Sequence, residues 1–328
     1  MRAPDFWARD GALPRLLSPL GWLYGTAGAL RQASATPLRL DVPVICVGNI
    51  TAGGVGKTPV ALSLARLLTD SGRRPHFLSR GYGGRLAGPV RVDPQIHGYR
   101  DVGDEPLLLA RAAPCWISRD RAAGGRAAQE NGAGVVIMDD GFQNPSLAKD
   151  LSLVVVDGAT GFGNGRVIPA GPLREPVARG LSRASALVVV GPDRCGLAAL
   201  ARHAGLTLLR AGMVPGPEAA ALAGKRAVAF AGIGRPAKFF DTLRGLDVTL
   251  LSCHAFADHH PFTRAEIETI LEEARSQEAI VLTTAKDFVR LPQDLRPHVG
   301  VLGIELRWED EAALHHVLRK AWERDGNE

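Results

Sequence analysis

Short apolar runs alternate with helical patterns over the first two thirds of the chain. The runs are rich in Val and Ile and are bounded by glycine or polar residues, which is typical of parallel strands buried on both faces. Such strands are predicted at 42–47, 76–79, 134–138, 151–156 and 186–190. Apolar residues recur at helical spacing at 58–68, 105–112 and 119–131. The alternation predicts an α/β fold with a doubly wound, mainly parallel sheet.

The pattern is interrupted once and then starts again. Residues 211–224 (AGMVPGPEAAALAG) are rich in Pro, Gly and Ala, as domain boundaries often are. Beyond them, strands are predicted at 227–231, 279–283 and 299–304, and helices at 236–243, 264–276 and 311–324. We therefore expect three parts, an N-terminal segment at 1–32, a larger domain at 33–215 and a smaller α/β domain at 222–328.

Residues 14–31 predict an amphipathic helix or two short ones. Its apolar residues are Leu16, Leu17, Leu20, Trp22, Leu23, Tyr24 and Leu30. The charge-free stretch at 16–30 is too short, and too often interrupted by Gly and Pro, to span a bilayer. Two interpretations stay open: the helix lies in a membrane interface, or it packs on the protein's own core. Periodicity alone favours the packed helix.

Composition narrows the class of protein. Hydrophobic residues make up 46% of the 328 residues and charged residues 22%, a balance that excludes disorder over most of the length. The formal net charge of +5 suits an anionic partner without naming one. Three Tyr and ten Phe offer few platforms for stacking bases, which argues against a nucleic acid partner. The four cysteines are scattered without a CxxC pair, so neither disulfides nor a zinc site is indicated.

The strongest motif is the glycine-rich segment after the first predicted strand, TAGGVGKT at 51–58. It fits the phosphate-loop pattern G-x-x-x-x-G-K-[ST], except that Thr51 replaces the first glycine. Strand, glycine loop and helix follow in the order that lets backbone N–H groups converge on phosphate oxygens. We expect Lys57 to reach the β- and γ-phosphates of a nucleotide, and Thr58 to bind Mg²⁺. The predicted nucleotide-binding residues are Thr51, Ala52, Gly53, Gly54, Val55, Gly56, Lys57 and Thr58.

An acidic pair, Asp139 and Asp140, ends the apolar run at 134–138. A carboxylate at the carboxyl edge of a sheet, near a phosphate loop, is what holds Mg²⁺ in a Walker B site. Strands also end in Asp as a plain turn signal, so the pair is informative only together with the phosphate loop. Adjacent carboxylates point in different directions, and we expect one of them to meet the metal directly.

Two further motifs are ambiguous from their residues alone. Asp104 and Glu105 precede a proline and an apolar helix, where local sequence favours helix capping over chemistry. Asp258, His259 and His260 precede another predicted helix. For these three residues a metal site, a histidine–carboxylate pair and a capped loop all stay open.

Several arginines lie where phosphate binding is possible. Arg174 belongs to the Gly- and Pro-rich loop 163–176, and Arg80 to the flexible segment 79–85. Arg119 and Arg121 stand at a predicted helix start. Guanidinium groups suit phosphates and transition-state charge, although solvated connectors and a plain helix start explain these residues equally well.

Together, the motifs resemble one family, the tetraacyldisaccharide 4'-kinases, which phosphorylate the lipid A precursor of Gram-negative bacteria. The resemblance rests on VGNITAGGVGKTP (47–59), LSRGYGG (78–84), VGDEPLLLA (102–110), MDDGFQN (138–144), GNGRVIPAGPLREP (163–176), AFAGIGRPAKFF (229–240), FADHHPFT (256–263) and TTAKDFVRL (283–291). Phosphate loops are shared by many enzymes, whereas LSRGYGG, GDEP, GPLREP and DHHPF in this order are specific. The chain departs from the family pattern at Asn144, where His is common, and at Ala285, where Glu is common.

The resemblance implies a P-loop NTPase-like kinase domain at 33–215 and a reaction that uses ATP and Mg²⁺. The γ-phosphoryl group would pass to the 4'-hydroxyl of a tetraacylated glucosamine disaccharide 1-phosphate. Asp104 looks like the family's catalytic carboxylate, and His259 like its partner. Glu105 looks like a metal-site residue beside Asp139 and Asp140. The candidates for binding the substrate 1-phosphate or the ATP phosphates are Arg174, Arg80, Arg119 and Arg121.

The same resemblance implies where the protein works. A substrate with four acyl chains cannot leave the bilayer cheaply, because each buried CH₂ contributes about 0.8 kcal/mol. We therefore expect a monomer that associates peripherally with the cytoplasmic face of the inner membrane. The membrane-interface interpretation of 16–30 then outweighs the packed helix. Because Asp104 and His259 fall in different predicted domains, we expect domain closure to complete the site.

Three alternatives can be checked against particular residues. A deviant-Walker ATPase switch of the ParA/MinD type carries a signature Lys where this chain has Ala52. A GTP-binding module needs an N-K-x-D motif, and the nearest segment, TAKD at 284–287, lacks the Asn. A soluble small-molecule P-loop kinase is opposed only weakly, by the apolar N-terminal segment.

Overall fold

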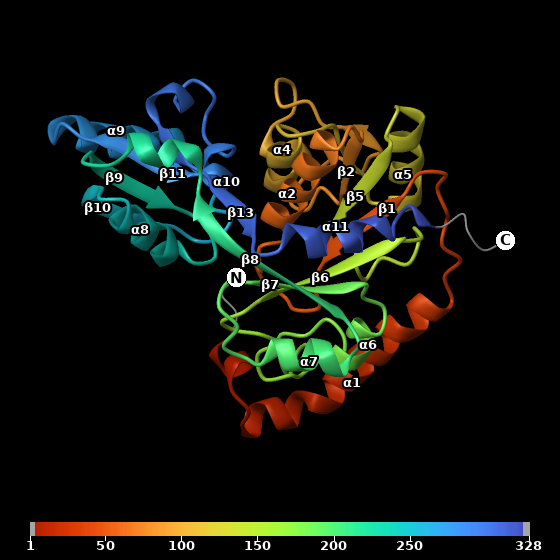
Figure 1. Ribbon diagram of the computed structural model, residues 1–328. Helices are drawn as coiled ribbons and strands as arrows, with labels where there is room; N and C mark the ends of the chain where they lie inside the picture. The colour runs from red at the N-terminus through yellow and green to blue at the C-terminus, as the bar shows by residue number, and fades with distance from the viewer. Residues whose placement is uncertain (1–3, 324–328) are drawn as a thin grey trace.

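The computed structural model describes residues 4–323 as two α/β units that a twisted pair of strands connects (Figure 1). Residues 1–3 and 324–328 lie outside the described residues. With them lie the outer ends of the predicted segments 1–32 and 222–328, and the last residue of the helix predicted at 311–324.

Within residues 4–323, the larger unit has a nine-stranded sheet in the order β13-β8-β7-β6-β1-β5-β2-β4-β3. Its strands are β1 (Val44–Gly48), β2 (Pro75–Ser79), β3 (Val90–Arg91), β4 (Cys115–Ile117), β5 (Val135–Asp139), β6 (Leu151–Asp157), β7 (Ala186–Val190), β8 (Thr207–Pro215) and β13 (Ile304–Trp308). Neighbouring strands are parallel except at the two edges, where β3 and β13 run antiparallel to β4 and β8. Every position of β1, β2, β5 and β7 is buried, as expected for strands covered on both faces.

Helices cover both faces of this sheet. On one face, α2 (Lys57–Asp70), α4 (Asp104–Leu109) and α11 (Glu311–Arg319) bury apolar side chains against the strands, and the short α3 (Tyr99–Val102) leads into α4. On the other face lie α5 (Arg121–Glu130), α6 (Val177–Leu181) and α7 (Leu197–His203). The two apolar clusters lie on opposite sides of the strands, so the predicted doubly wound, mainly parallel α/β fold is confirmed.

The smaller unit is a four-stranded parallel sheet in the order β10-β9-β11-β12. Its strands are β9 (Arg226–Ala231), β10 (Thr249–Ala255), β11 (Ile280–Thr284) and β12 (Gly300–Leu302). Its helical elements are η2 (Pro217–Ala221), α8 (Pro236–Gly245), α9 (Arg264–Ser276), α10 (Ala285–Phe288) and η3 (Arg296–His298). Helix α10 faces α4 of the larger unit, which places the two units in contact at that point (Figure 1).

The C-terminal part of the chain does not follow the predicted division into a larger domain ending at 215 and a smaller domain starting at 222. The first part of the presumed boundary, 211–215, is the end of β8, and the chain leaves the large sheet only at Pro215. The strand predicted at 299–304 ends at Leu302, and β13 then returns to pair with β8. Trp308 is buried there and donates its indole N–H to Ser63 of α2, 2.8 Å away. Residues 304–323 therefore pack with the larger unit, because β8 offers an edge that β13 can pair.

The N-terminal segment forms η1 (Asp5–Ala8) and one continuous helix, α1 (Ala12–Ala33), which lies beside α6 and α7 (Figure 1). Its buried residues are small: Pro14, Gly21 and Gly25. A Cβ atom on Gly21 would stand 2.7 Å from the carbonyl oxygen of Val167, so only glycine allows this approach. The large apolar side chains of the helix are exposed, namely Leu13, Leu16, Leu20, Trp22, Leu23, Tyr24 and Leu30. Over residues 4–323, we find no helix with the length and apolar character needed to cross a membrane.

Candidate active site

Asp104 is placed by a sharp turn before α4. Gly103 adopts a left-handed φ of 89°, and a Cβ there would stand 2.4 Å from the carbonyl oxygen of Tyr82. Glycine is thus required where the loop of Tyr82 crosses the start of the helix. The Asp104 carboxylate is only 4% exposed, and its Oδ1 accepts the backbone N–H of Glu105 at 3.1 Å. The second oxygen, Oδ2, points toward the smaller unit.

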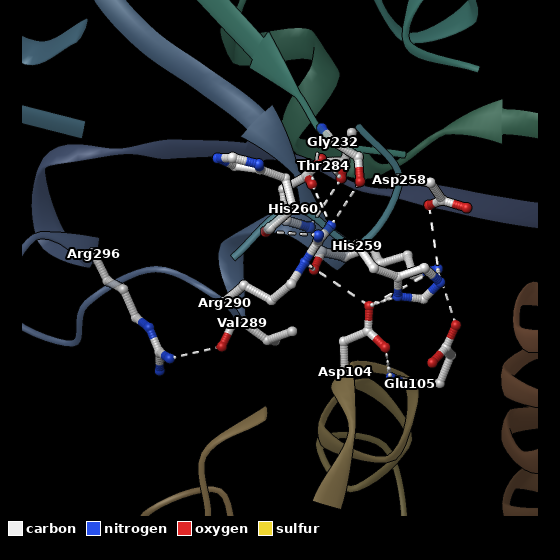
Figure 2. Close-up of polar contacts among 12 residues, drawn as sticks. Asp104, Glu105, Gly232, Asp258, His259, His260, Thr284, Val289, Arg290 and Arg296 are labelled. Atoms are coloured by element: carbon white, nitrogen blue, oxygen red, sulfur yellow. Dashed lines mark hydrogen bonds and ion pairs between the residues drawn. The ribbon is translucent and has the colours of Figure 1, made fainter. Parts of the chain in front are cut away.

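His259 meets Asp104 from the smaller unit. It lies in the loop between β10 and α9, where its φ of 59° is left-handed and its backbone N–H donates to Gly232 at 3.1 Å. Its Nδ1 atom lies 2.9 Å from Oδ2 of Asp104 (Figure 2). Of the interpretations left open for His259, the geometry is that of a histidine–carboxylate pair. For Asp104, local sequence favoured a helix cap, but its carboxylate also forms a bond with His259 of the other unit.

Two cations complete this cluster, and both follow β11. The Lys286 ammonium lies 2.9 Å from Oε1 of Glu105, 3.2 Å from Nε2 of His259 and 3.8 Å from Oδ2 of Asp104. Arg290 is buried and approaches the same Asp104 oxygen at 3.8 Å. Its guanidinium donates to the carbonyl oxygens of Gly232 and His260 and pairs with Asp287 (Figure 2).

Asp104, Glu105 and His259 bring their ligand atoms within 4.8 Å of one another, a spacing compatible with a metal ion. Lys286 lies within 4 Å of all three, so a side-chain cation already supplies positive charge at that point. Asp139 and Asp140 do not belong to this group in the part of the chain that the structure describes. The role of Glu105 as a ligand beside Asp139 and Asp140 therefore stays a prediction.

The cluster shifts the pKa values of its members in different directions. Burial raises the pKa of Asp104, but the hydrogen bond with His259 and the charge of Lys286 outweigh burial and hold that pKa well below its usual range. Burial and the adjoining Asp104 raise the pKa of Glu105, while Lys286 opposes the rise. The bond to Asp104 raises the pKa of His259, against burial and Lys286. Asp104 is therefore fully ionised at neutral pH, and Glu105 is the weaker acid of the two.

The phosphate loop lies between β1 and α2, as predicted. Gly53 and Gly56 have φ values of 116° and 94°, which favour glycine, and α2 begins at Lys57. The loop 172–174 braces its start, because Ala52 donates its N–H to the carbonyl oxygen of Pro172 at 2.7 Å. Lys57 donates to Oδ1 of Asn49 at 3.3 Å and lies 3.7 Å from Oδ2 of Asp140. The ammonium is thus held at the mouth of the loop.

Asp139 fits a magnesium ligand. It ends β5, is buried, and has one oxygen, Oδ1, without a hydrogen-bond partner among residues 4–323. Burial raises its pKa to about 6, Lys57 opposes the rise, Asp140 adds to it, and a hydrogen bond with Thr58 opposes it slightly. A leftover carboxylate oxygen beside a threonine hydroxyl is a donor set that Mg²⁺ prefers.

Asp140 is engaged differently. Its φ of 55° turns the side chain toward Arg174, whose two terminal nitrogens lie 2.8 Å and 3.1 Å from the two carboxylate oxygens. Burial raises the pKa of Asp140, but Lys57 and Arg174 outweigh burial and lower it. This two-point ion pair joins the loop 163–176 to the end of β5.

The other three predicted phosphate-binding arginines have different surroundings. Arg80, at the end of β2, and Arg119 are exposed. Arg121 is buried at the start of α5, donates to the carbonyl oxygen of Ser118, and has an unpartnered Nε within the described chain. The pKa of Arg121 is lowered to about 10, first by burial and then by the nearby charge of Arg80, while Asp140 and Asp139 oppose the change. Arg80 and Arg121 therefore face the same region as the acidic pair.

Comparison with known proteins decides the family. A family model described as tetraacyldisaccharide-1-P 4'-kinase matches residues 13–323. The chain belongs to this family. The resemblance of the sequence motifs is thereby confirmed, and the alternatives of an ATPase switch and a GTP-binding module are set aside.

Members of the family align along nearly the whole chain. A tetraacyldisaccharide 4'-kinase of Paramagnetospirillum magneticum is 60% identical over 314 residues, which cover 96% of this chain and 97% of the relative. One from Rhodospirillum rubrum is 56% identical over 321 residues, which cover 97% of each chain. A solved structure of LpxK from Aquifex aeolicus in complex with ATP superposes with a TM-score of 0.75 at 28% identity, covering 94% of this chain and 99% of that one.

The two departures from the family pattern have local roles in the structure. Asn144 accepts hydrogen bonds from the backbone N–H and the hydroxyl of Ser146, at 3.0 Å and 2.8 Å, and so shapes the turn after β5. Ala285 is the first residue of α10, directly after the capping residue Thr284. Among residues 4–323, neither side chain has a hydrogen bond or ion pair with Asp104 or His259.

Sequence reasoning assigned no role to Lys286, Asp287 and Arg290, although the segment TTAKDFVRL was recognised as a family motif. Asp287 and Arg290 are buried charges on successive turns. A signal was present in the sequence, because a Lys and an Arg follow directly on a strand end and flank an Asp. Their target could not be read from that pattern, since Asp104 and Glu105 are far away in the sequence.

Proposed function

We propose that this chain transfers the γ-phosphoryl group of ATP to the 4'-hydroxyl of a tetraacylated glucosamine disaccharide 1-phosphate, a step in lipid A biosynthesis. The observation that carries the proposal is the bond between Asp104 and His259, made at the start of α4, which packs against α2, the helix that follows the phosphate loop. A phosphate loop alone fits many enzymes. A buried, ionised carboxylate beside it fits one that must take a proton from a hydroxyl acceptor.

The residues of the larger unit would position the nucleotide. Lys57 and the N–H groups of the phosphate loop would hold the β- and γ-phosphates. Asp139 and Thr58 would hold Mg²⁺, which when bound neutralises charge on the phosphate oxygens. Asp140 would act through its ion pair with Arg174, which fixes the loop that braces the phosphate loop.

Asp104 would accept the proton of the 4'-hydroxyl as the new bond to phosphorus forms. Its pKa is low, so it is ready as a base at neutral pH, and burial keeps competing water away. His259 would hold the carboxylate in place through the hydrogen bond to Oδ2. Because the two residues come from different units, contact between α4 and the β10–α9 loop is needed to assemble the site.

Helix α1 would attach the protein to the cytoplasmic face of the inner membrane without crossing it. Its large apolar side chains are exposed, with Leu16 at 76% and Trp22 at 69%, while its glycines pack on the loop around Val167. An apolar face of this kind is stabilised by burial at the boundary of headgroups and acyl chains. A monomer without a nucleic acid partner remains our expectation.

The arginines would bind anionic groups of the two substrates. Arg80 is exposed, and Arg121 is buried with one nitrogen, Nε, that has no hydrogen-bond partner among residues 4–323. The charge of Arg80 is close enough to lower the pKa of Arg121. Arg119 is exposed beside them along the chain. We assign these three to a phosphate of ATP or to the substrate 1-phosphate, and Arg174 to positioning through Asp140.

Phosphate transfer from γ-labelled ATP tests the proposal directly. The acceptors are the tetraacylated disaccharide 1-phosphate and its deacylated form, presented to the full chain in mixed micelles. We expect label on the lipid, at the 4'-position, and much weaker labelling of the deacylated sugar. Label on the deacylated sugar alone would favour a soluble small-molecule kinase. Release of inorganic phosphate without transfer to either acceptor would contradict the kinase proposal.

A further inference from the structure

Lys286 contacts three side chains of the candidate site and is not explained by nucleotide or metal binding. It lies on α10, whose start is capped when Thr284 accepts the backbone N–H of Asp287 at 3.1 Å. Its ammonium bridges the two units, because Glu105 on α4 lies 2.9 Å away. Its second neighbour is Oδ2 of Asp104, at 3.8 Å, and its third is Nε2 of His259, at 3.2 Å. The contact with His259 has a chemical consequence.

A lysine ammonium is a hydrogen-bond donor and has no acceptor. Its contact with Nε2 is therefore a hydrogen bond only if Nε2 offers its lone pair. The ring proton then resides on Nδ1, and Nδ1–H donates to Oδ2 of Asp104 at 2.9 Å. We propose that Lys286 is a positioning residue that holds His259 in the Nδ1–H tautomer and so directs its proton to Asp104.

A competing arrangement is built into the same loop. Oδ1 of Asp258 lies 3.9 Å from Nε2 of His259, on the side of the ring away from Asp104 (Figure 2). With Nε2–H, the ring would donate to Asp258, and Nδ1 would turn a lone pair toward the Asp104 carboxylate. Two acceptors would then face each other, and the bond across the units would be lost. Lys286 excludes this state because it cannot face Nε2–H.

Other contacts hold Lys286 and the His259 ring in the positions that the Nδ1–H tautomer requires. Glu105 holds the ammonium by an ion pair, and Arg290 ties α10 to the carbonyl oxygens of Gly232 and His260. Gly232 also accepts the backbone N–H of His259. Tyr82 lies edge-on to the imidazole, with 6.4 Å between ring centroids. The His259 ring is thus fixed by both units, and the choice of tautomer rests with Lys286 and Asp258.

The inference rests on the proposed function for its effect on turnover, but the tautomer itself is measured without substrates. Nitrogen NMR of the full chain, labelled with ¹⁵N-histidine, reports which ring nitrogen of His259 carries the proton. The signal is assigned by its loss in His259→Gln. We expect Nδ1 protonated and Nε2 unprotonated in the unsubstituted chain at pH 8. A spectrum with the proton on Nε2 overturns the proposal before any lysine variant is made.

Variants of Lys286 then test whether this lysine determines the tautomer of His259. Lys286→Met removes the donor and keeps the bulk, and we expect the proton to move to Nε2 and kcat to fall about tenfold or more with KM for ATP little changed. Lys286→Arg keeps a charged donor and should keep both the tautomer and most of kcat. The matched control is Lys238→Met, at an exposed lysine on α8 of the same unit, which should change neither.

The combination of readouts separates failure of this inference from failure of the kinase proposal. A proton that stays on Nδ1 in folded Lys286→Met overturns the positioning role, whatever happens to kcat. If no phosphate transfer is found at all, the kinase proposal fails, and the NMR result still decides the tautomer. Lys286→Leu, which also removes the donor, replaces Lys286→Met if the latter does not fold.

Discussion

The Nδ1 atom of His259 lies 2.9 Å from Oδ2 of Asp104, although 155 positions separate the two residues in the chain. Asp104 begins α4 of the larger unit, and His259 belongs to the loop after β10 of the smaller unit. The bond therefore exists only when the two units are in contact. If Asp104 is the base that we propose, this division would couple proton transfer to closure, because an open arrangement would separate Asp104 from His259.

Asp104→Asn tests the proposed base. The amide keeps the shape of the side chain but cannot take a proton, so we expect kcat to fall roughly 10²- to 10⁴-fold. ATP affinity should change little, because the phosphate loop is untouched. His259→Ala should be less severe if Asp104 is the base. Steady-state kinetics and equilibrium ATP binding check this, and equally mild losses in both variants would mean that the two residues only stabilise the loop and the helix.

Lys57→Ala tests the phosphate loop. The lysine is held by Asn49 and Asp140 at the start of α2, where it would neutralise the transferring phosphate. We expect turnover to be nearly abolished, with a thermal unfolding temperature close to that of the unsubstituted chain. Lys225→Ala, at an exposed lysine before β9, is the control and should retain full activity. Retained activity in Lys57→Ala would remove the loop from the mechanism.

The first half of the site could be predicted from the sequence because its signals are local. Strand, glycines, Lys57 and Thr58 occur within one supersecondary unit, and Asp139 ends the strand that pairs directly with β1. Parallel neighbours bring their carboxyl ends to one edge of the sheet. The position of the acidic pair beside the phosphate loop followed from that rule alone.

The second half could not be predicted from the residues because it depends on contacts between units. Local sequence favoured a helix cap for Asp104 and left His259 open, and only the family resemblance joined them. Nothing in the segment around Lys286 reveals that its target is Glu105. The pairing of β13 with β8 was missed for the same reason, because whether a segment becomes an edge strand depends on the strand that it pairs with.

The N-terminal helix shows a third kind of limit. Periodicity favoured a helix that packs its apolar bulk on the core. The structure instead packs Gly21 and Gly25 and exposes the leucines, because backbone-to-backbone approach needs no side chain. Such an approach is invisible to a pattern of hydrophobic residues, since glycine is not counted as a core former.

Gly21→Val tests this mode of packing. A Cβ at Gly21 would stand 2.7 Å from the Val167 carbonyl oxygen, so a valine must push α1 away from the loop 163–176. We expect a lower thermal unfolding temperature and faster proteolysis of α1. Gly28→Val on the same helix is the control, because a Cβ there meets no atom within 4 Å. Equal stability of the two variants would show that the glycine contact does not hold the helix.

A triple variant tests the proposed membrane role of α1. It combines Leu16→Ser, Leu23→Ser and Leu30→Ser. These side chains are exposed, so the variant should fold normally but lose apolar area that would enter the bilayer. We expect less sedimentation with anionic liposomes and a higher KM for the lipid acceptor. Ile96→Ser, at an exposed apolar residue outside α1, should leave binding unchanged. Deletion of 1–31 should act in the same direction, and unchanged sedimentation would contradict the role.

Asp139 and Asp140 should affect stability with opposite signs when no metal is present. Burial raises the pKa of Asp139 from 3.8 to about 6, so between these values the folded state binds a proton that the unfolded state has released. Its contribution to the free energy of unfolding is complete below pH 4 and is lost as pH rises through 6, and the loss amounts to roughly 3 kcal/mol. Asp140 has a lowered pKa, so its contribution is present above pH 4 and is lost only as pH falls further.

Urea unfolding in EDTA at pH 5 and pH 8 measures the difference. Asp139→Asn cannot ionise and should unfold at higher urea than the unsubstituted chain at pH 8, with a smaller gap at pH 5. Asp140→Asn should be destabilised at pH 8, because it loses the ion pair with Arg174. Added Mg²⁺ should stabilise the unsubstituted chain at pH 8 by favouring the charged form of Asp139, and should have less effect on Asp139→Asn. If Asp139→Asn and the unsubstituted chain show the same pH dependence and the same response to Mg²⁺, Asp139 is not the buried carboxylate that meets the metal.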